Sequence, residues 1–350
     1  MLGDDLIIPG ERMLDTIWCS FVINMPWKQL KGWSKNKFLN PYENYYHKNY
    51  NGISFRYYYN FYRNKIHCPR LWMDFSAATM QNGINILGYN FGKSHLAIKE
   101  IETTISKVIG RPISLKDINC ISRIDINRDN RCKSEVEKQQ LLNFFKKIKG
   151  CSGMKQNVYE TGVTVGNSDV ELKFYFKDQD INLGEEICSY MPKMCRTEFE
   201  IKNYRINKYY PEDLNLYTLL TNKRMTESVW NSLLDEFRIG GEICDEDTLR
   251  NKAKKVFNNT KRIRNRKFRQ LKQINNTNDK IKHRSKTLEQ SKDVVKELDE
   301  AGVCPYSCET PIVLRIDLTP KTIKKRVTYY IVVPVISKQP VRLMGYLDSS

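Results

Sequence analysis

The sequence predicts an α+β fold, in which helices back one face of an antiparallel sheet and leave the other face open. Strict alternation of apolar and polar residues in three segments predicts strands that bury one face. Other segments carry apolar residues at mostly helical spacing, which predicts the covering helices. A Gly-Asn pair at residues 166–167 favours a tight turn between two strands.

The N-terminal elements are predicted to be strands. The first covers about residues 14–22, and it leads into a hairpin made of residues 52–62 and 71–75. Tyrosines are frequent between residues 42 and 62, and tyrosine is a favoured strand residue. These tyrosines are also interleaved with basic residues, an arrangement that can stack unpaired bases while the cations hold a nucleic-acid backbone. Both explanations stay open.

Two helices and a strand are predicted next. Apolar residues recur at mostly helical spacing in residues 94–108, and a second helix is expected at about residues 134–149. Between them, residues 121–127 alternate as a strand, with Arg123 and Asp125 on the polar face.

The clearest alternation lies in two later segments, residues 171–178 and 196–202. Each places its phenylalanines and aliphatic residues on one face and its polar residues on the other. The outward positions are Lys173, Tyr175, Lys177, Arg196, Glu198, Glu200 and Lys202. Paired in one sheet with residues 121–127, these strands bring a tyrosine, carboxylates and cations to a common open face.

The C-terminal region is basic and mostly helical. Residues 252–286 hold fourteen lysines and arginines but one acid, Asp279, which gives +13 of the net charge of +18. Residues 252–272 are predicted as a helix that can lie along DNA or in its major groove. The alternative is a solvated helix that keeps the protein soluble. The cations expected to contact DNA here are Lys261, Arg262, Arg264, Arg266, Lys267 and Arg269.

A further helical stretch through Leu298 and strands at about residues 313–318 and 327–335 complete this region. The 350 residues suffice for two cores. We therefore predict two domains, residues 1–210 and residues 211–350.

Composition restricts the location and the partners of the protein. The net charge of +18 suits a polyanionic partner. No secretory signal is expected in the first ten residues, and the longest apolar run, residues 329–336, is far shorter than the ~20 residues of a membrane span. The ten cysteines are therefore expected to be reduced thiols of a cytoplasmic protein without a membrane partner. The close pair Cys304 and Cys308 has too few partners to predict a zinc site.

The polar face carries groups suited to cutting a phosphodiester. A tyrosine phenolate stores the bond energy of a cut strand as a phosphoester, so Tyr175 is the candidate nucleophile. The tyrosines near enough in sequence to be alternative nucleophiles are Tyr159, Tyr204, Tyr209 and Tyr210. Lys177 on the same face can stabilise the phenolate or the charge that develops on the phosphate. The alternative is an ordinary half-buried sheet whose charges stabilise the strands across its wet face.

Carboxylates and arginines complete this candidate site. Asp125 and Glu198 are suited to a hard divalent cation, Mg²⁺ or Mn²⁺. Arg196 and Arg123 can clamp phosphate oxygens or neighbouring carboxylates, because a guanidinium donates a planar pair of hydrogen bonds. Lys173 is a further cation for DNA.

Eight short segments, taken in order, resemble the gene II and gene X replication initiators of filamentous phages and their plasmid rolling-circle relatives. The resemblance covers about the first 210 residues. The segments are residues 13–17 (Met-Leu-Asp-Thr-Ile), 52–55, 73–76, 83–85, 121–125 (Ile-Ser-Arg-Ile-Asp), 156–164, 175–177 (Tyr-Phe-Lys) and 196–198 (Arg-Thr-Glu).

This resemblance implies a site-specific nickase that acts at a replication origin. It implies that Tyr175 attacks the scissile phosphate and stays joined to the 5′ end, while the 3′-hydroxyl primes a host polymerase and a host helicase assists. Reversal of the transfer then rejoins the displaced strand. Asp125 and Glu198 lie in matching strands, and Glu160 falls on a matching segment as a further metal candidate.

One departure from the wider rolling-circle superfamily affects the metal ligands. Many members hold their metal with a His-apolar-His pair, whereas none of the four histidines here has that spacing. The ligands are therefore expected to be carboxylates. Two other functions stay open: a plasmid rather than phage initiator, and a basic DNA- or RNA-binding regulator that makes no covalent bond. A regulator would not need Tyr175 or a divalent cation.

Overall fold

The computed structural model describes residues 13–38, 44–63, 66–83, 88–148, 153–179, 193–239, 242–243, 245–257, 261–275, 291–301, 303–307 and 312–313. All of these residues belong to one compact unit, Met1–Leu318. The second unit, Thr319–Ser350, lies outside the described residues.

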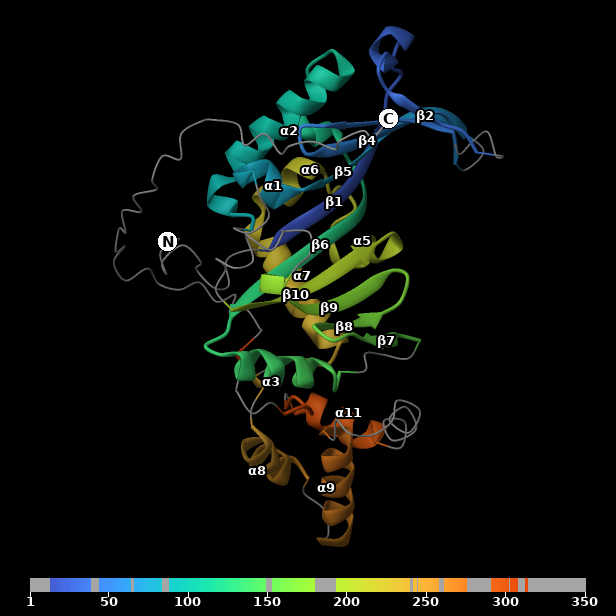
Figure 1. Ribbon diagram of the computed structural model, residues 1–350. Helices are drawn as coiled ribbons and strands as arrows, with labels where there is room; N and C mark the ends of the chain where they lie inside the picture. The colour runs from blue at the N-terminus through green and yellow to red at the C-terminus, as the bar shows by residue number, and fades with distance from the viewer. Residues whose placement is uncertain are drawn as a thin grey trace. The chain divides into compact units, whose positions relative to one another are not determined.

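The centre of the fold is a ten-stranded antiparallel sheet in the order β2-β3-β4-β5-β1-β6-β10-β9-β8-β7 (Figure 1). Its strands are β1 Leu14–Val22, β2 Ser34–Asn36, β3 Tyr45–Tyr50, β4 Ile53–Arg63, β5 Ile66–Ser76, β6 Cys120–Arg131, β7 Lys155–Val158, β8 Gly162–Gly166, β9 Val170–Phe176 and β10 Met194–Lys202. The strands β2 to β5 therefore lie on one side of the central pair β1 and β6, and β7 to β10 lie on the other side.

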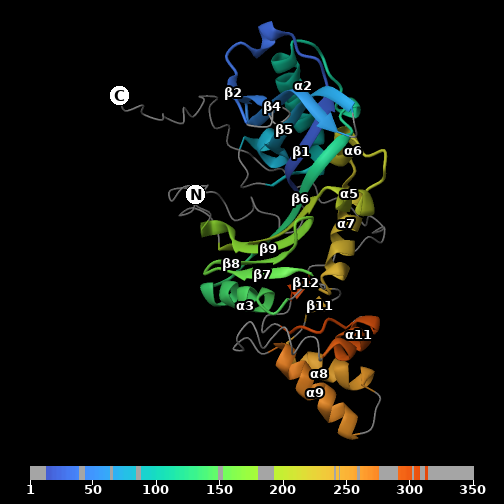
Figure 2. The ribbon, with the colours of Figure 1, turned by 90° about the vertical axis from the view of Figure 1, so that its right-hand side faces the viewer.

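Helices accompany the sheet, and Figure 2 shows α5, α6 and α7 along one side of it. The described helices are α1 Ala77–Asn82, α2 Ser94–Ile109, α3 Glu135–Phe145, α5 Tyr204–Tyr209, α6 Leu216–Thr221, α7 Lys223–Glu236, α8 Glu246–Val256, α9 Lys261–Asn275 and α11 Lys292–Glu300. Short 3₁₀ turns lie at η2 Trp27–Leu30, η4 Phe91–Lys93, η5 Leu115–Asp117 and η6 Lys177–Gln179, and β11 Glu242–Ile243 pairs with β12 Ile312–Val313. The predicted α+β class is confirmed.

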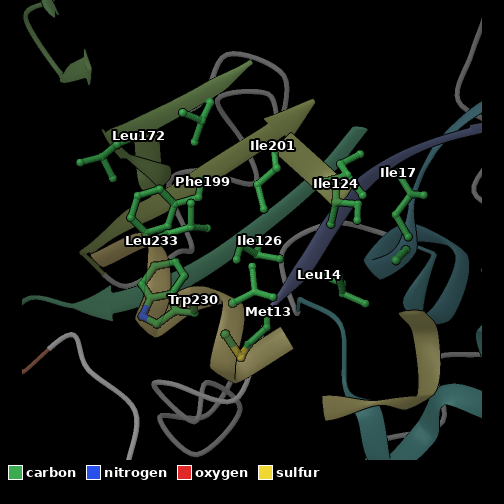
Figure 3. Close-up of a cluster of buried hydrophobic side chains, with 14 of the residues drawn as sticks. Met13, Leu14, Ile17, Ile124, Ile126, Leu172, Phe199, Ile201, Trp230 and Leu233 are labelled. Atoms are coloured by element: carbon green, nitrogen blue, oxygen red, sulfur yellow. The ribbon is translucent and has the colours of Figure 1, made fainter. Parts of the chain in front are cut away.

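The apolar face of the sheet packs against the helices through aromatic side chains (Figure 3). Phe199 of β10 lies 5.0 Å from Trp230 of α7, measured between ring centroids. Phe174 of β9 stacks on Phe145 of α3 at 4.2 Å. Truncating such a buried ring typically costs about 3–5 kcal/mol, so these contacts fix which face of the sheet is the core.

The sequence predicts most element positions well. The first strand has the expected bounds, and the predicted hairpin is β4 with β5. It is preceded by a two-residue turn, Asn51–Gly52, that joins β3 to β4, and both turn residues have positive φ, 49° and 79°. That backbone suits an Asn-Gly hairpin turn, because Asn and Gly tolerate the left-handed region best.

The single helix predicted for residues 252–272 is wrong. The chain forms two helices there, α8 and α9, and Asp245 caps α8 by accepting a hydrogen bond from the Thr248 backbone N–H at 2.8 Å. Phe257 at the end of α8 lies 5.5 Å from Phe268 of α9. The interruption lets the two helices pack on each other, which buries Phe257 completely.

Other predictions for the C-terminal region are only partly within the described residues. β12 overlaps the strand expected at residues 313–318 at Val313, whereas the strand expected at residues 327–335 lies outside the described part. Trp230, beyond the predicted boundary at residue 210, packs on the same sheet as the preceding residues. The two-domain division itself stays a prediction.

Two further findings concern the part of the chain that the structure describes. Its cysteines are free thiols, with Cys19, Cys132, Cys195 and Cys304 buried. No described helix is both long and apolar enough to cross a membrane.

Candidate active site

Strand register brings the predicted polar side chains together on β6, β10 and β9. Glu198 pairs with Lys173 of β9 on one side and with Asn127 of β6 on the other, and Arg196 pairs with Tyr175. The alternation predicts this common face correctly. The face is only partly open over these strands, because Asp125 is 1 % exposed and Glu198 is 6 % exposed, whereas Lys173 and Tyr175 stay partly exposed. Burial of so many charges is tolerated because they pair with one another.

Tyr175 lies at the centre of this cluster. Its hydroxyl donates a hydrogen bond to Oε2 of Glu198 at 3.2 Å. Burial and the negative charge of Glu198 raise the pKa of the Tyr175 hydroxyl well above its usual value, while Arg196 opposes them. The tyrosine is therefore a neutral phenol in the protein alone, and a nucleophilic role requires a group that takes its proton.

Arg196 is fully buried and holds two carboxylates. Its Nε and Nη2 donate to the two oxygens of Asp129 at 2.6 and 2.9 Å, and its Nη1 donates to Asp15 at 2.9 Å. Burial alone would lower the pKa of this guanidinium, but Asp129, Tyr175 and Asp15 raise it well above its usual value. Of the two predicted roles for Arg196, the structure shows the clamping of neighbouring carboxylates.

Asp15 and Asp129 are site residues that sequence reasoning missed. Asp15 also accepts hydrogen bonds from Ser76 at 3.0 Å and from Asn127 at 3.2 Å, so it ties β1, β5, β6 and β10 together. The alternation of residues 123, 125 and 127 continues to residue 129, and following it would have found Asp129. Asp15 lies within an irregularity in the β1–β6 register, between Leu14 and Ile17, and no local period indicates it.

A ladder of alternating charges leads from β6 to β9. Arg123 donates to both oxygens of Asp125 at 2.8 and 2.5 Å and also contacts Glu200 at 2.7 Å. Glu200 binds Lys173 at 2.5 Å, and Lys173 reaches Glu198 at 3.3 Å. Arg123 and Lys173, both predicted to contact DNA, are thus held by carboxylates in the protein alone.

Two of the three acids of this ladder, Asp125 and Glu200, differ in protonation. Burial raises the pKa of Asp125 to about 7, helped by the charge of Glu198 and opposed by Arg123. Burial acts in the same direction on Glu200, but hydrogen bonds from Lys173 and Lys202 hold the pKa of Glu200 below its usual value. Asp125 is therefore the carboxyl whose charge changes near neutral pH.

Lys177 and Glu160 lie at the end of β9 nearest to Tyr175. Lys177 begins η6 instead of continuing the strand as predicted, and its Nζ lies 5.9 Å from the centroid of the Tyr175 ring. Glu160 occupies the exposed turn between β7 and β8. The neighbouring Thr161 carbonyl accepts the Phe176 N–H at 3.0 Å, which places this turn beside the end of β9. The roles of Lys177 and Glu160 stay predictions.

The carboxylates provide an incomplete set of metal ligands. Within the described residues, no group of three or more His, Cys, Asp or Glu side chains could hold a metal ion. Asp125 and Glu198 offer hard oxygen ligands, but both are engaged by cations or by Tyr175. Two carboxylates suit Mg²⁺ when waters and substrate phosphates supply the remaining ligands.

The basic helix α9 presents part of its predicted DNA-binding set to solvent. Its exposed cations are Lys261, Arg262, Arg266, Arg269 and Lys272. Arg264 and Lys267 are partly buried, and Lys267 pairs with Glu297 of α11. Helical spacing puts Arg262, Arg266 and Arg269 in one stripe, so this stripe is the part of the helix best placed for phosphate contacts.

Together these features define an α+β protein with a tyrosine among paired carboxylates on its sheet and with an exposed basic helix. The family model for the N-terminal part of the phage gene II replication-associated protein matches residues 23–279. The chain therefore belongs to this family, which confirms the resemblance to the filamentous-phage gene II initiators, and it is a replication-associated protein. No individual curated protein matches the sequence.

Proposed function

We propose that this protein initiates rolling-circle replication by nicking one strand of DNA at an origin and later rejoining it. The observation that carries the proposal is the hydrogen bond from Tyr175 to Glu198, in a family of replication-associated proteins. It gives a potential nucleophile a direct proton acceptor. The neighbouring cations suit a phosphate that approaches the tyrosine.

In the proposed reaction, the Tyr175 oxygen attacks the scissile phosphorus while Glu198 takes the phenolic proton. A bond forms between phosphorus and the tyrosine oxygen, and the bond to the 3′-oxygen breaks. The 3′-oxygen takes a proton from solvent water and becomes a free hydroxyl that can prime synthesis. The 5′ phosphate stays on Tyr175, so the reverse transfer to a 3′-hydroxyl rejoins the strand.

The charges around the tyrosine have distinct proposed roles. Lys177 stabilises negative charge on the phenolate or on the phosphate, because its ammonium faces the Tyr175 ring. Arg196 is a positioning residue, since Asp129 and Asp15 fix it beside the tyrosine. Once a phosphate is present, Arg123 and Lys173 can exchange carboxylate partners for phosphate oxygens.

A divalent cation, Mg²⁺ or Mn²⁺, is part of this proposal. Asp125 and Glu198 would hold it, with Glu160 as a further candidate, and it would polarise the scissile phosphate. Such a cation would compete with Arg123 for Asp125 and would favour the ionised carboxylate. Metal dependence is therefore expected to change with pH near the pKa of Asp125, about 7.

The proposed partners follow from the same chemistry. DNA binds both at the tyrosine cluster and through the cations of α9. A host polymerase then extends the 3′-hydroxyl, and a host helicase assists. These steps take place in the cytoplasm of a bacterial host. The alternative function, a regulator on the same fold, predicts DNA binding without any covalent product.

The test compares wild type with Tyr175→Phe on labelled single-stranded DNA that carries a candidate origin, with Mn²⁺ or with EDTA. A denaturing gel detects covalent adducts. We expect a metal-dependent adduct that Tyr175→Phe abolishes. Tyr204→Phe is the matched control, because this tyrosine is 64 % exposed and lies beyond the end of β10. Binding without an adduct would favour the regulator, and an adduct that survives Tyr175→Phe would move the nucleophile elsewhere.

A further inference from the structure

The polar face of the sheet continues beyond the tyrosine cluster onto β1, β5, β4 and β3, where its chemistry changes. This second part holds mainly aromatic and basic side chains, together with one partly buried acid, Asp74, whose charge interacts with Arg56 and Arg123. We name it the aromatic patch. Its members are Tyr45, Arg56, Tyr58, Arg70 and Trp72, and all five are partly exposed.

Strand register shows that the aromatic patch and Tyr175 share one face. Tyr46 pairs with Tyr57, and both are buried on the core side, so the neighbouring Tyr45 and Tyr58 face the other way. Arg56 pairs with Trp72, which in turn pairs with Ser20 of β1. Two residues along β1 from Ser20, Trp18 pairs with Arg123 of the charge ladder. The face is therefore continuous from β3 to β9.

The rings of the patch form a row across three strands. Ring centroids lie 5.1 Å apart for Tyr45 and Tyr58 and 6.4 Å apart for Tyr58 and Trp72. Phe38, which is 49 % exposed, extends the row from Tyr45 at 5.9 Å. Such a row of partly exposed rings offers successive stacking surfaces to unpaired bases.

Basic side chains accompany the rings. Arg56 and Arg70 belong to the same face, and Nη1 of Arg70 donates to Ser20 at 3.0 Å. Arg123 lies 4.8 Å from the Trp18 ring, at the border with the tyrosine cluster. Rings combined with guanidinium groups favour a partner that has both aromatic bases and phosphates.

We propose that the aromatic patch binds unpaired bases of single-stranded DNA on one side of the strand cut at Tyr175. That the bound DNA is the strand cut at Tyr175 rests on the proposed function. That the patch binds single-stranded DNA does not. Trp72 and Tyr175 lie on strands that are four places apart in the sheet, roughly 19 Å at ~4.8 Å per strand spacing. Strand register puts Trp72 level with Cys120 of β6 and Tyr175 level with Asp129, which adds roughly 30 Å along the strands at ~3.3 Å per residue. The separation is therefore roughly 35 Å, which about ten nucleotides span at the ~3.4 Å rise of a B-form strand.

The first experiment measures the Kd of a fluorescein-labelled oligo(dT) of sixteen nucleotides by anisotropy. The variants are Trp72→Leu and Tyr58→Leu, with Trp72→Phe to test rescue by a ring. Trp27→Leu is the matched control, because Trp27 is 68 % exposed and packs against Tyr46, a residue of the opposite face. Each Leu variant of the patch is expected to raise Kd about tenfold. Trp72→Phe should recover most of the affinity, and Trp27→Leu should bind like the wild type.

A second measurement keeps the proposal testable if a Leu variant does not fold. Wild type is irradiated with an oligonucleotide containing 5-iododeoxyuridine, and crosslinked peptides are identified by mass spectrometry. Crosslinks at Tyr45, Tyr58 or Trp72 are expected. Wild-type affinity in both folded Leu variants, or crosslinks confined to other parts of the chain, would overturn the proposal.

Failure of the patch and failure of the nicking reaction give different results. Tyr175→Phe should abolish the covalent adduct and keep most of the oligo(dT) affinity, because phenylalanine retains the ring and removes only the attacking oxygen. Trp72→Leu should weaken binding but still allow an adduct at high DNA concentration. If wild type forms no adduct while Trp72→Leu still weakens binding, the patch stands and the nickase does not.

Discussion

The two parts of the polar face use one backbone pattern for different chemistry. In the tyrosine cluster on β6, β10 and β9, Arg196 is fully buried and Asp125 is 1 % exposed, and both are paired. In the aromatic patch on β3, β4 and β5, side chains such as Arg56 and Trp72 stay partly exposed. Alternation therefore decides which face a side chain joins, but burial decides whether a charge must be neutralised by its neighbours.

This difference suits the tyrosine cluster to positioning the candidate nucleophile and the aromatic patch to binding a ligand. Buried, paired charges have few alternative arrangements, so they hold the candidate nucleophile in a defined geometry. Partly exposed rings and guanidinium groups lose little on meeting a ligand and can accommodate different bases. Four sets of substitutions test this contrast, from the largest expected effect to the smallest.

The largest effect is expected on the free energy of unfolding, when one arginine in each part is separately replaced by methionine. Arg196→Met leaves Asp129 and Asp15 buried without their cation, and should lower the free energy of unfolding by about 3–5 kcal/mol. Arg56→Met in the aromatic patch should cost under about 1 kcal/mol, because this arginine is partly exposed. Urea unfolding followed by circular dichroism measures both. Equal costs would mean that the two parts do not differ in charge burial.

The second prediction concerns the pH dependence of adduct formation. With a pKa of about 7, Asp125 is mostly protonated at pH 6 and mostly ionised at pH 8. If the ionised form is required, the rate should rise about tenfold over this interval, and Asp125→Asn should remove the dependence. Binding of oligo(dT) to the aromatic patch provides a control and should change little. A rate in the wild type that is flat with pH would argue against a role for ionised Asp125.

The free energy of unfolding should fall as pH rises, whereas the rate of adduct formation should rise. The pKa of Asp125 is higher in the folded protein than its unfolded value of ~3.9, so its contribution to stability falls as pH rises from about 4 to about 7. Asp125→Asn should lessen this fall in urea unfolding at pH 5 and pH 8. An unchanged pH dependence would mean that other groups dominate.

The third prediction asks whether α9 adds affinity without selecting single strands. Replacing Arg262, Arg266 and Arg269 with Gln should lower the slope of log K against log salt by about two to three for duplex DNA. The loss of affinity should be similar for single and double strands, unlike that of Trp72→Leu. Lys267→Gln is the control, since Lys267 pairs with Glu297. A slope unaffected by the triple substitution would return α9 to the role of a solvated helix.

The smallest effect compares two glycines in turns. Gly52 and Gly153 have φ of +79° and +86°, so Ala should cost about 1 kcal/mol at either position. Gly52 lies in the hairpin that carries Tyr45 and Tyr58, whereas Gly153 precedes β7. Gly52→Ala alone should therefore also weaken oligo(dT) binding, by about twofold. Equal binding by both variants would show that the hairpin turn does not position the patch.

The sequence by itself determined the faces of the strands. The side-chain period of two is a local property of extended backbone, so Tyr175, Glu198 and Asp125 could be assigned to one face before any pairing was known. The same kind of reasoning indicated the core side of α2, because its apolar residues recur at the helix period. The short motifs also identified the family.

Only the tertiary structure decided which charges meet and how deeply they are buried. Arg196 finds Asp129 and Asp15 at sequence separations of 67 and 181 residues, and no local period can specify such partners. The packing of Phe257 of α8 on Phe268 of α9 likewise brings together residues of two separate helices. Alternation is set by neighbours along the chain, whereas desolvation and ion pairing depend on neighbours in space.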